Sequence, residues 1–439
     1  MRVLQVLLVI LAVAGGLIGV QAYLSQTTPT ERKAAEIARQ GPTVYRLPPG
    51  KLERASALGG TRRKLAVTAE MMFPLELLLL LVTGLAARMQ DAVSRVSSRR
   101  WIQGYGILFL LLLAVQLLSL PVQVWGHRTA LEYGISVQGW TSWLGDKAKL
   151  FLLAWGLGGL LLMLLVWVIR RSPERWWLWF WMAAAGVTVA GVFVSPYVFD
   201  PLFNQFEPLA KSDPALVQRL EQVVARGGLT IPPERMFLMK ASAKSTELNA
   251  YVTGFGSSKR VVVWDTTVAK SSPNETAFIF AHEMGHYALG HVMLGTALAC
   301  AAMLPTFWIG KQCVRGLLAR WGGRWRIPGE QDWAAMAVLL FVLTAISALS
   351  DPLGNSVSRA MEHAADVYGQ EAVHGIVADP ESVGSRSFQV LGEESLDDPV
   401  PHAAFNWWFG THPPLWFRAN FAAAYDPWRA GEHPKYFAK

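Results

Sequence analysis

One stretch of the chain has histidines and a carboxylate at the spacing of a metal-binding helix. Residues 281–291 are AHEMGHYALGH. On a helix His282 and His286 share a face, because residues four apart lie about 5–6 Å from each other. Such a pair binds zinc, and Glu283 between them could be the general base that activates water. A catalytic zinc site uses three protein ligands, so this stretch lacks one.

The third ligand has to come from elsewhere in the chain. His291 follows the second histidine by five residues, about 140° around a helix, so we expect a surface or interfacial histidine there. The run 355–366, NSVSRAMEHAAD, is a better source. Glu362 would be the third ligand. Asp366 on the same helix face would accept a hydrogen bond from the ring nitrogen of a ligand imidazole that does not bind the metal. Arg359 could pair with either carboxylate. Without the histidine run, an ordinary solvated helix would be the preferred interpretation.

Short elements surround the histidine run. Ser272 and Glu275 form a capping box, which predicts a helix that starts there, includes both histidines and continues into the next apolar stretch. Met236–Lys240 and Arg260–Trp264 are short apolar or β-branched runs, so we expect two strands. Residues 376–400 are rich in Ser, Gly and acidic side chains and predict a mobile, solvated loop.

Long apolar runs determine the fold class. Most have the roughly 17–25 residues that cross a bilayer as a helix. The seven runs are Val3–Val20, Phe73–Ala87, Ile102–Val124, Leu150–Ile169, Trp176–Val198, Met293–Ile309 and Trp333–Leu349. Many of the 19 tryptophans lie at their ends, as in an interfacial aromatic belt. Seven such runs argue against a soluble protein.

These patterns predict an α-helical multi-pass membrane protein with about seven transmembrane helices and a small α/β cap that carries the histidine run. The first run would also suit a cleavable signal peptide, but we favour an uncleaved helix. The predicted division of the chain is a transmembrane helix or signal-anchor (1–22), a polar loop segment (23–72), transmembrane helices two to five (73–200), a catalytic region with the histidine run (201–291), transmembrane helices six and seven (292–350) and a C-terminal catalytic region with the third ligand (351–439).

Charge and cysteine content exclude other classes of protein. Cys300 and Cys313 have no paired spacing, so neither a disulfide framework nor a cysteine zinc site is expected. The net charge of +8 is spread over short loops, so no nucleic-acid partner is expected. Basic residues cluster after the second, fourth and sixth runs. By the positive-inside rule those loops are cytoplasmic and the histidine run is extracytoplasmic, although the basic segment 23–72 would then lie outside too.

Several motifs, in order along the chain, resemble one family: the integral-membrane zinc metalloproteases typified by the type I CAAX prenyl endopeptidases. The likeness extends from Ser195 to Arg418, about half of the chain. Its motifs are SPY at 195–197, PLFNQFEPL at 201–209, NAYVTG at 249–254, KRVVVWDT at 259–266, the His-Glu-x-x-His helix, SRxxExxxD at 358–366 and THPP at 411–414. Together they are far more specific than the histidine run alone.

The resemblance implies that the seven transmembrane helices surround a chamber and that the small α/β cap is zincin-like and catalytic. It also implies a complete set of site residues. One Zn²⁺ per chain would be held by His282, His286 and Glu362. Glu283 would be the base, and His412 would donate to the transition state with Arg418 nearby. An edge strand with Asn249, Ala250 and Tyr251 could bind an extended peptide as one more strand. The well-known eukaryotic members work on the cytoplasmic side, opposite to the side that loop charges favour here.

The expected activity is zinc-dependent hydrolysis of peptide bonds in membrane-associated or prenylated (CAAX-type) substrates. The partners would be a peptide or protein, lipidated or not, and the lipid bilayer. A general quality-control membrane protease would use the same chemistry without prenyl specificity. A transporter or receptor with an incidental motif should carry charges inside its apolar runs, which are nearly free of them. An inactive metal-binding scaffold should have lost the base, yet Glu283 is present.

Overall fold

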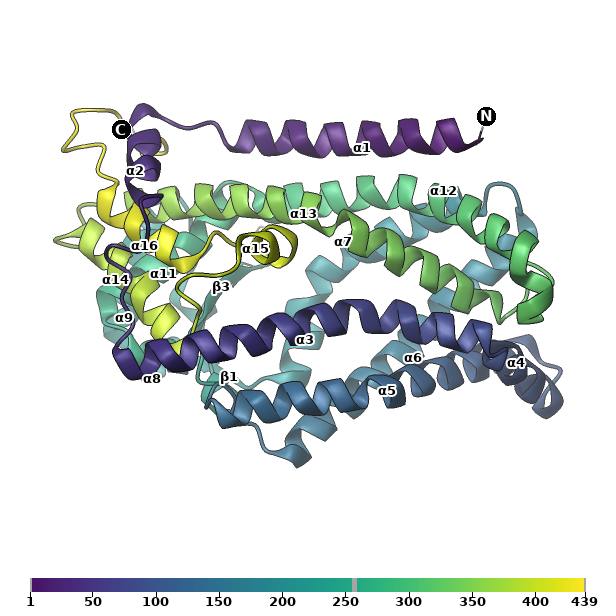
Figure 1. Ribbon diagram of the computed structural model, residues 1–439. Coiled ribbons are helices and arrows are strands. Elements are labelled where there is room, and N and C mark those ends of the chain that lie inside the picture. Colours follow the sequence, from purple (N-terminus) through teal and green to yellow (C-terminus); the bar gives the residue numbers. More distant parts are fainter. Residues whose placement is uncertain (1, 255–258, 438–439) are drawn as a thin grey trace.

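Long helices make up most of the molecule. The computed structural model describes residues 2–254 and 259–437. In this described part, seven helices are long and apolar enough to cross a membrane (Figure 1). They are α1 (Arg2–Leu24), α3 (Pro49–Val82), α5 (Arg100–Glu132), α6 (Trp140–Arg171), α7 (Trp176–Phe203), α12 (His291–Trp325) and α13 (Ala335–Val373). Each predicted apolar run overlaps one of them, so the prediction of about seven membrane helices is confirmed.

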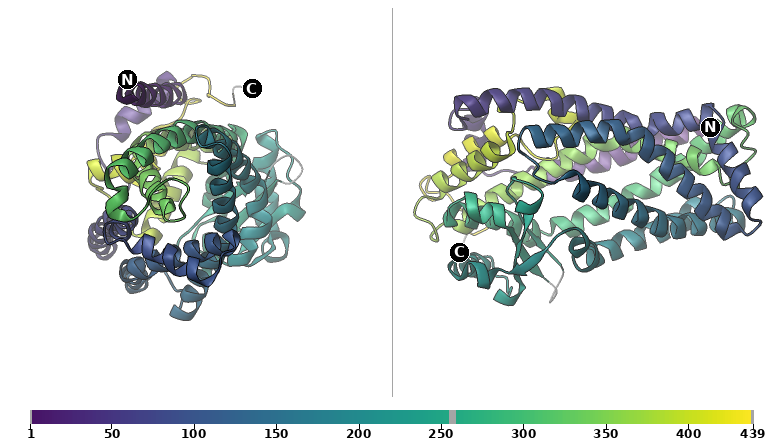
Figure 2. Two further views of the ribbon diagram at one scale, coloured as in Figure 1. Left: turned by 90° about the vertical axis from the view of Figure 1, so that its right-hand side faces the viewer. Right: turned by 90° about the horizontal axis from the view of Figure 1, so that it is seen from below.

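Six of these helices form a closed ring. The contacts run from α3 to α5, α6, α7, α12 and α13 in turn, and from α13 back to α3. Seen along their length, the helices surround a common centre, and α1 lies outside the ring against α13 (Figure 2). The short helix α4 (Leu85–Val96) connects α3 to α5. Leu80, Ile107 and Leu165 belong to a buried apolar cluster that joins α3, α5 and α6.

One end of the ring carries a small α/β cap with a four-stranded sheet (Figure 1). Its strands are β1 (Phe206–Pro208), β2 (Met236–Met239), β3 (Ala250–Thr253) and β4 (Arg260–Trp264), in the order β1-β2-β4-β3. β2 and β4 are parallel and confirm the two predicted strands, while β3 pairs antiparallel with β4 at the edge. The helices of the cap are α2 (Pro29–Ala38), α8 (Leu209–Ser212), α9 (Pro214–Arg226), α10 (Asp265–Lys270), α11 (Pro273–Ala288), α14 (Pro380–Ser395), α15 (Ala403–Phe409) and α16 (Leu415–Ala424).

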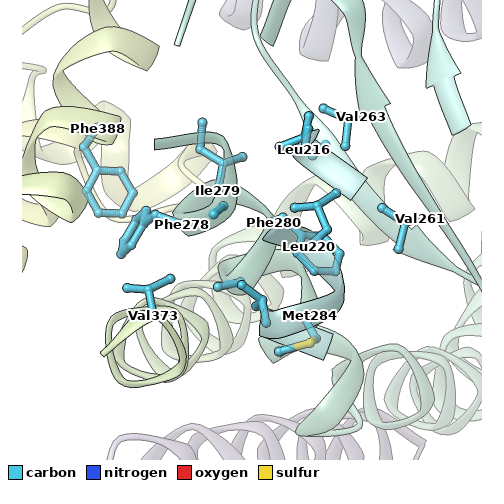
Figure 3. Close-up of a cluster of buried hydrophobic side chains, with 14 of the residues drawn as sticks. Leu216, Leu220, Val261, Val263, Phe278, Ile279, Phe280, Met284, Val373 and Phe388 are labelled. Carbon is cyan, nitrogen blue, oxygen red and sulfur yellow. The ribbon is translucent and has the colours of Figure 1, made fainter. Parts of the chain in front are cut away.

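Helix α11 lies at the centre of the cap core. The predicted capping box is present, with Ser272 accepting from the backbone of Glu275 and Glu275 from that of Ser272. Side chains of α11 pack against α9, β4, α13 and α14, as Figure 3 shows for Phe278, Phe280 and Met284. Each fully buried Phe or Met stabilises the fold by about 1.5–3 kcal/mol. Several such contacts therefore hold α11 firmly in place.

The segment 23–72, predicted as a polar loop, is largely helical. It contains α2 and more than two thirds of α3. In α2 three small residues, Ala34, Ala35 and Ala38, are buried against Phe421 and Tyr425. Alanine is the best helix former but adds little hydrophobicity, so the composition suggests a loop where a helix forms.

The segment 376–400, predicted as a mobile loop, is also mainly helical, because α14 occupies its centre. Asp379 caps the first turn by accepting from the backbone of Ser382. A Cβ at Gly384 would lie 2.9 Å from the Phe278 ring, and Ser387 is fully buried. Glycine and serine here permit close helix packing, which composition alone does not distinguish from a loop.

Candidate active site

The three predicted ligands converge where α11 meets α13. The Nε2 atoms of His282 and His286 are 3.2 Å apart, and each lies 3.3 Å from a carboxylate oxygen of Glu362. Metal–ligand bonds of about 2.0–2.2 Å at tetrahedral angles separate the ligand atoms by roughly 3.3–3.5 Å. The Oε2 atom of Glu362 is also buried without a hydrogen-bond partner. Spacing and donor set therefore fit a metal ion.

A close approach between two helices creates this geometry. A Cβ at Gly369 of α13 would lie 3.0 Å from the backbone nitrogen of His282. A Cβ at Gly285 of α11 would lie 3.1 Å from the side chain of Tyr368. Because both positions are glycine, the backbones of α11 and α13 come close enough for Glu362 to reach the histidines.

Asp366 and Arg418 form a buried pair behind the ligands. Asp366 Oδ1 lies 2.9 Å from Nδ1 of His282, and Arg418 of α16 donates to both Asp366 oxygens at 2.6 and 2.9 Å. The Arg418 guanidinium also lies 3.6 Å from Glu362 and over the Phe388 ring. A carboxylate on Nδ1 orients a ligand imidazole and selects the tautomer that presents Nε2.

The electrostatic environment favours a positive charge at the site. Burial opposes a charge on His282, but the neighbouring carboxylates of Asp366 and Glu362 outweigh burial and raise the pKa of His282 to about 10. Glu283 is half-buried, and burial raises its pKa above the usual range for a carboxyl group. A carboxylate with a raised pKa is a better proton acceptor near neutral pH.

His412 lies beside the ligand set and is open to solvent. Its Nε2 is 3.3 Å from Oε1 of Glu362, and its Nδ1 is 2.8 Å from the Thr411 hydroxyl. The side chain is 56% exposed. A donor nitrogen of His412 can therefore face a substrate at the site.

A cavity of about 590 Å³ opens onto these residues. Volumes of about 300–1,000 Å³ are usual for ligand sites. The active-site wall includes His282, Glu283, His412 and Arg418, and other parts of the lining include Asn249 and Phe409. A short stretch of peptide fits this space.

The predicted substrate-binding residues are divided between two places. Ala250 and Tyr251 belong to the edge strand β3, and Asn249 precedes it at the cavity wall. Tyr251 donates its hydroxyl to Asp200 of α7 at 3.3 Å and lines a second cavity. Asn249 therefore lines the active-site cavity, where its side-chain oxygen accepts from the backbone of Ala250, whereas the side chain of Tyr251 contacts the ring.

Arg359 does not pair with a carboxylate, so that part of the prediction is wrong. It donates to the carbonyl oxygens of Gly410 at 2.5 Å and Trp407 at 3.4 Å. Asn355, one turn earlier, donates to the carbonyl of Trp408 at 2.5 Å. The last carbonyls of a helix lack partners within the helix and attract cationic and polar donors. Arg359 thus fixes the end of α15, three residues before His412.

His291 is buried, whereas a surface or interfacial histidine was predicted. It is 5% exposed, and its Nδ1 lies 3.0 Å from Nδ1 of His286. The predicted continuous helix is also wrong: α11 ends at Ala288, and α12 starts at His291 after Gly290, which has φ +70°. A glycine just after a helix commonly adopts this left-handed conformation, so Gly290 was the available sequence signal.

Fold and site define an integral-membrane metallopeptidase. Residues 210–425 match the family model of peptidase family M48, and residues 38–205 match that of the CAAX prenyl protease N-terminal region with five membrane helices. A metalloprotease of Bacillus subtilis, described as uncharacterized, is 31% identical over 346 residues, which are 78% of each chain. Together with these matches, that likeness shows that the chain belongs to peptidase family M48.

Two further likenesses concern proteins of fungi. CAAX prenyl protease 1 of Saccharomyces cerevisiae is 31% identical over 180 residues, which are 40% of this chain and 39% of the yeast protein. The crystal structure of S. mikatae Ste24p superposes with a TM-score of 0.74 at 18% identity, covering 90% of this chain and 100% of the other. The structural match supports the observed fold, with its ring of helices and small sheet.

Proposed function

We propose that this metallopeptidase is a zinc endopeptidase that cleaves membrane-associated peptides of the CAAX type. The observation that carries the proposal is the convergence of His282, His286 and Glu362 beside Glu283, at a cavity where the cap meets the ring. Several relatives support the substrate class, because they are named CAAX prenyl proteases.

Zinc bound to His282, His286 and Glu362 would supply a Lewis acid and lower the pKa of water towards ~7. Glu283 would take a proton from the attacking water and deliver it to the nitrogen of the departing amine, because its raised pKa suits both transfers. His412 would donate a hydrogen bond to the negative charge that develops on the substrate carbonyl oxygen.

Two other side chains would support this reaction without touching the substrate's scissile bond. Asp366 would hold His282 by its Nδ1 atom, and Arg418 would neutralise Asp366. Arg359 would position the segment that carries His412 through its hydrogen bond to Gly410. We also propose that Asn249 and Ala250 bind the substrate backbone along the open edge of β3.

The wall of the cavity also suits apolar groups of the substrate. Phe405 and Phe409 of α15 line the cavity, and their rings stack at 4.7 Å. No residue of α15 is buried, so its aromatic side chains remain available for contact. A prenyl chain or apolar peptide side chains would bury surface there, at about 25 cal/mol per Å².

A general membrane-protein protease is the second candidate, and the charge distribution favours it. Basic residues gather at the end of the ring remote from the cap, where Arg326 pairs with Asp91 and Arg315 with Glu174. The positive-inside rule would make that end cytoplasmic and the active site extracytoplasmic. Prenylated C-termini lie in the cytoplasm, so an extracytoplasmic site would process other membrane-associated chains.

Cleavage of a quenched-fluorescent C-terminal peptide, farnesylated or not, tests both candidates. We expect the purified protein to cleave the farnesylated form, to stop under chelation and to recover with zinc. Cleavage of both forms at equal rates would support the general protease. If wild type binds zinc but cleaves neither peptide, the proposed substrates are wrong. If it binds no zinc, the metal site itself is wrong.

A further inference from the structure

The two ligand histidines are held by different partners on their outer nitrogens. Nδ1 of His282 faces Asp366, whereas Nδ1 of His286 faces Nδ1 of His291 at 3.0 Å. The rings of His286 and His291 meet nearly edge to face, with centroids 5.0 Å apart. His291 is 5% exposed, so this contact is shielded from water.

The proton count of this contact assigns a role to His291. A neutral imidazole carries one N–H, and a metal can bind only the other nitrogen. If His286 presents Nε2 to the metal, its Nδ1 carries the hydrogen and must donate. His291 then accepts through its own Nδ1. We propose that His291 is a positioning residue that fixes the tautomer and ring orientation of His286, a proposal that rests on the metal site argued above.

Gly290 makes this contact possible. On a continuous helix, position 291 would lie about 140° around the axis from position 286. Gly290 has φ +70° and ψ +22°, so the chain turns and α12 begins with His291 facing back towards His286. An added Cβ at Gly290 would meet no atom within 4 Å. Any effect of substitution there would therefore come from the backbone conformation and not from a clash.

A neutral acceptor suits this position better than a carboxylate would. The carboxylates of Glu283, Glu362 and Asp366 already lie around the site, and Arg418 is the cation that pairs with Asp366. A further carboxylate against His286 would add negative charge in a buried place, which is costly without a partner. A histidine accepts the same hydrogen bond without adding charge.

Three substitutions at His291 distinguish a hydrogen bond through Nδ1 from simple packing. In His291→Asn the amide oxygen takes the place of Nδ1, whereas in His291→Gln it lies near the place of Nε2. His291→Leu removes the acceptor and keeps the bulk. The measurement is the dissociation rate of zinc from the detergent-purified, zinc-loaded full chain into excess chelator, with the apo-protein melting temperature as a folding check.

We expect His291→Leu and His291→Gln to raise the dissociation rate of zinc about 10–100-fold. Metal affinity usually falls by that factor when a ligand histidine loses the hydrogen-bond partner of its other ring nitrogen. His291→Asn should stay within about threefold of wild type. His363→Leu is the matched control, since His363 is next to Glu362 but packs on Phe421 with ring centroids 4.6 Å apart. That control should retain zinc like wild type.

Substitution of the preceding glycine gives a second, independent test. Gly290→Val keeps His291 but disfavours the left-handed turn, so it should weaken zinc binding like His291→Leu. Gly290→Asn tolerates the turn and should be milder.

Two results would overturn the proposal: wild-type zinc retention in His291→Leu, or equal losses in the Asn, Gln and Leu variants, which would indicate packing alone. A wild-type protein that binds no zinc would instead refute the proposed function. The experiment therefore separates the two failures.

Discussion

Removal of Arg418 should destabilise the protein more strongly without metal than with it. The guanidinium is buried, donates to both oxygens of Asp366 and lies 3.6 Å from Glu362. Arg418→Met leaves the buried Asp366 carboxylate with the His282 imidazole as its remaining neighbour, and removal of one partner of a buried ion pair typically costs about 3–5 kcal/mol. That is a large share of the roughly 5–15 kcal/mol that stabilises a typical domain.

A bound divalent ion would offset part of this cost. The carboxylates of Glu283, Glu362 and Asp366 surround one guanidinium, so the ion brings the formal charge of the site to zero. We therefore expect Arg418→Met to lower the melting temperature more in chelator than in zinc. Tryptophan fluorescence can follow the unfolding, because the chain has 19 tryptophans.

A double substitution tests whether the charge is the cause. In Arg418→Met with Asp366→Asn, the amide oxygen still accepts from His282 and no unpaired charge remains. We expect the double variant to be more stable than Arg418→Met alone, by about 1–3 kcal/mol. The reasoning fails if the double variant is no more stable than the single one, or if chelator and zinc give equal losses.

Three further outcomes are expected. Glu283→Gln should lower peptide cleavage about 10²–10⁴-fold while zinc content, measured by metal analysis, stays unchanged, because only the base is lost. Gly369→Ala should destabilise the protein by about 1–3 kcal/mol in thermal unfolding, since the added Cβ would press on the backbone of His282. The control is Gly354→Ala, in open space on the same helix, which should be neutral or stabilise the protein by up to about 1 kcal/mol. Burial raises the pKa of Asp397 to about 6, so this carboxyl group binds its proton more tightly in the folded protein than in the unfolded chain. The tighter proton binding stabilises the fold fully below about pH 4, and this stabilisation is lost as the pH rises through 6. Asp397→Asn should therefore melt higher than wild type at pH 7.5 and equally at pH 4.

The parts of the site that local patterns encode could be predicted from the sequence. The capping box at Ser272 and the four-residue spacing of the histidines place both imidazoles on one face of α11. Glu362 was predicted to join them and does converge with them, because a single helix, α13, carries it from the ring into the cap. Apolar runs likewise predict the seven membrane helices, because their length has to match the bilayer.

Other features depend on contacts that no local pattern reports. The turn at Gly290 brings His291 onto His286, whereas extrapolation of a straight helix places it on the surface. Arg359 has carboxylates within one or two turns, yet it binds the end of α15, about 50 residues away. The partners of α2 and α14 likewise lie far along the chain, so their polar composition alone suggests loops.

The docking of the N-terminal segment on helix α16 also limits the order in which the chain can fold. The backbone of Val44 donates to Asn420, 376 residues later in the chain. At about 5–20 residues per second, the ribosome needs roughly 20–75 s to make the intervening residues. His412 and Arg418 are also made after all seven membrane helices, the last of which ends at Val373. All seven membrane helices are therefore made before the residues of the candidate active site are complete.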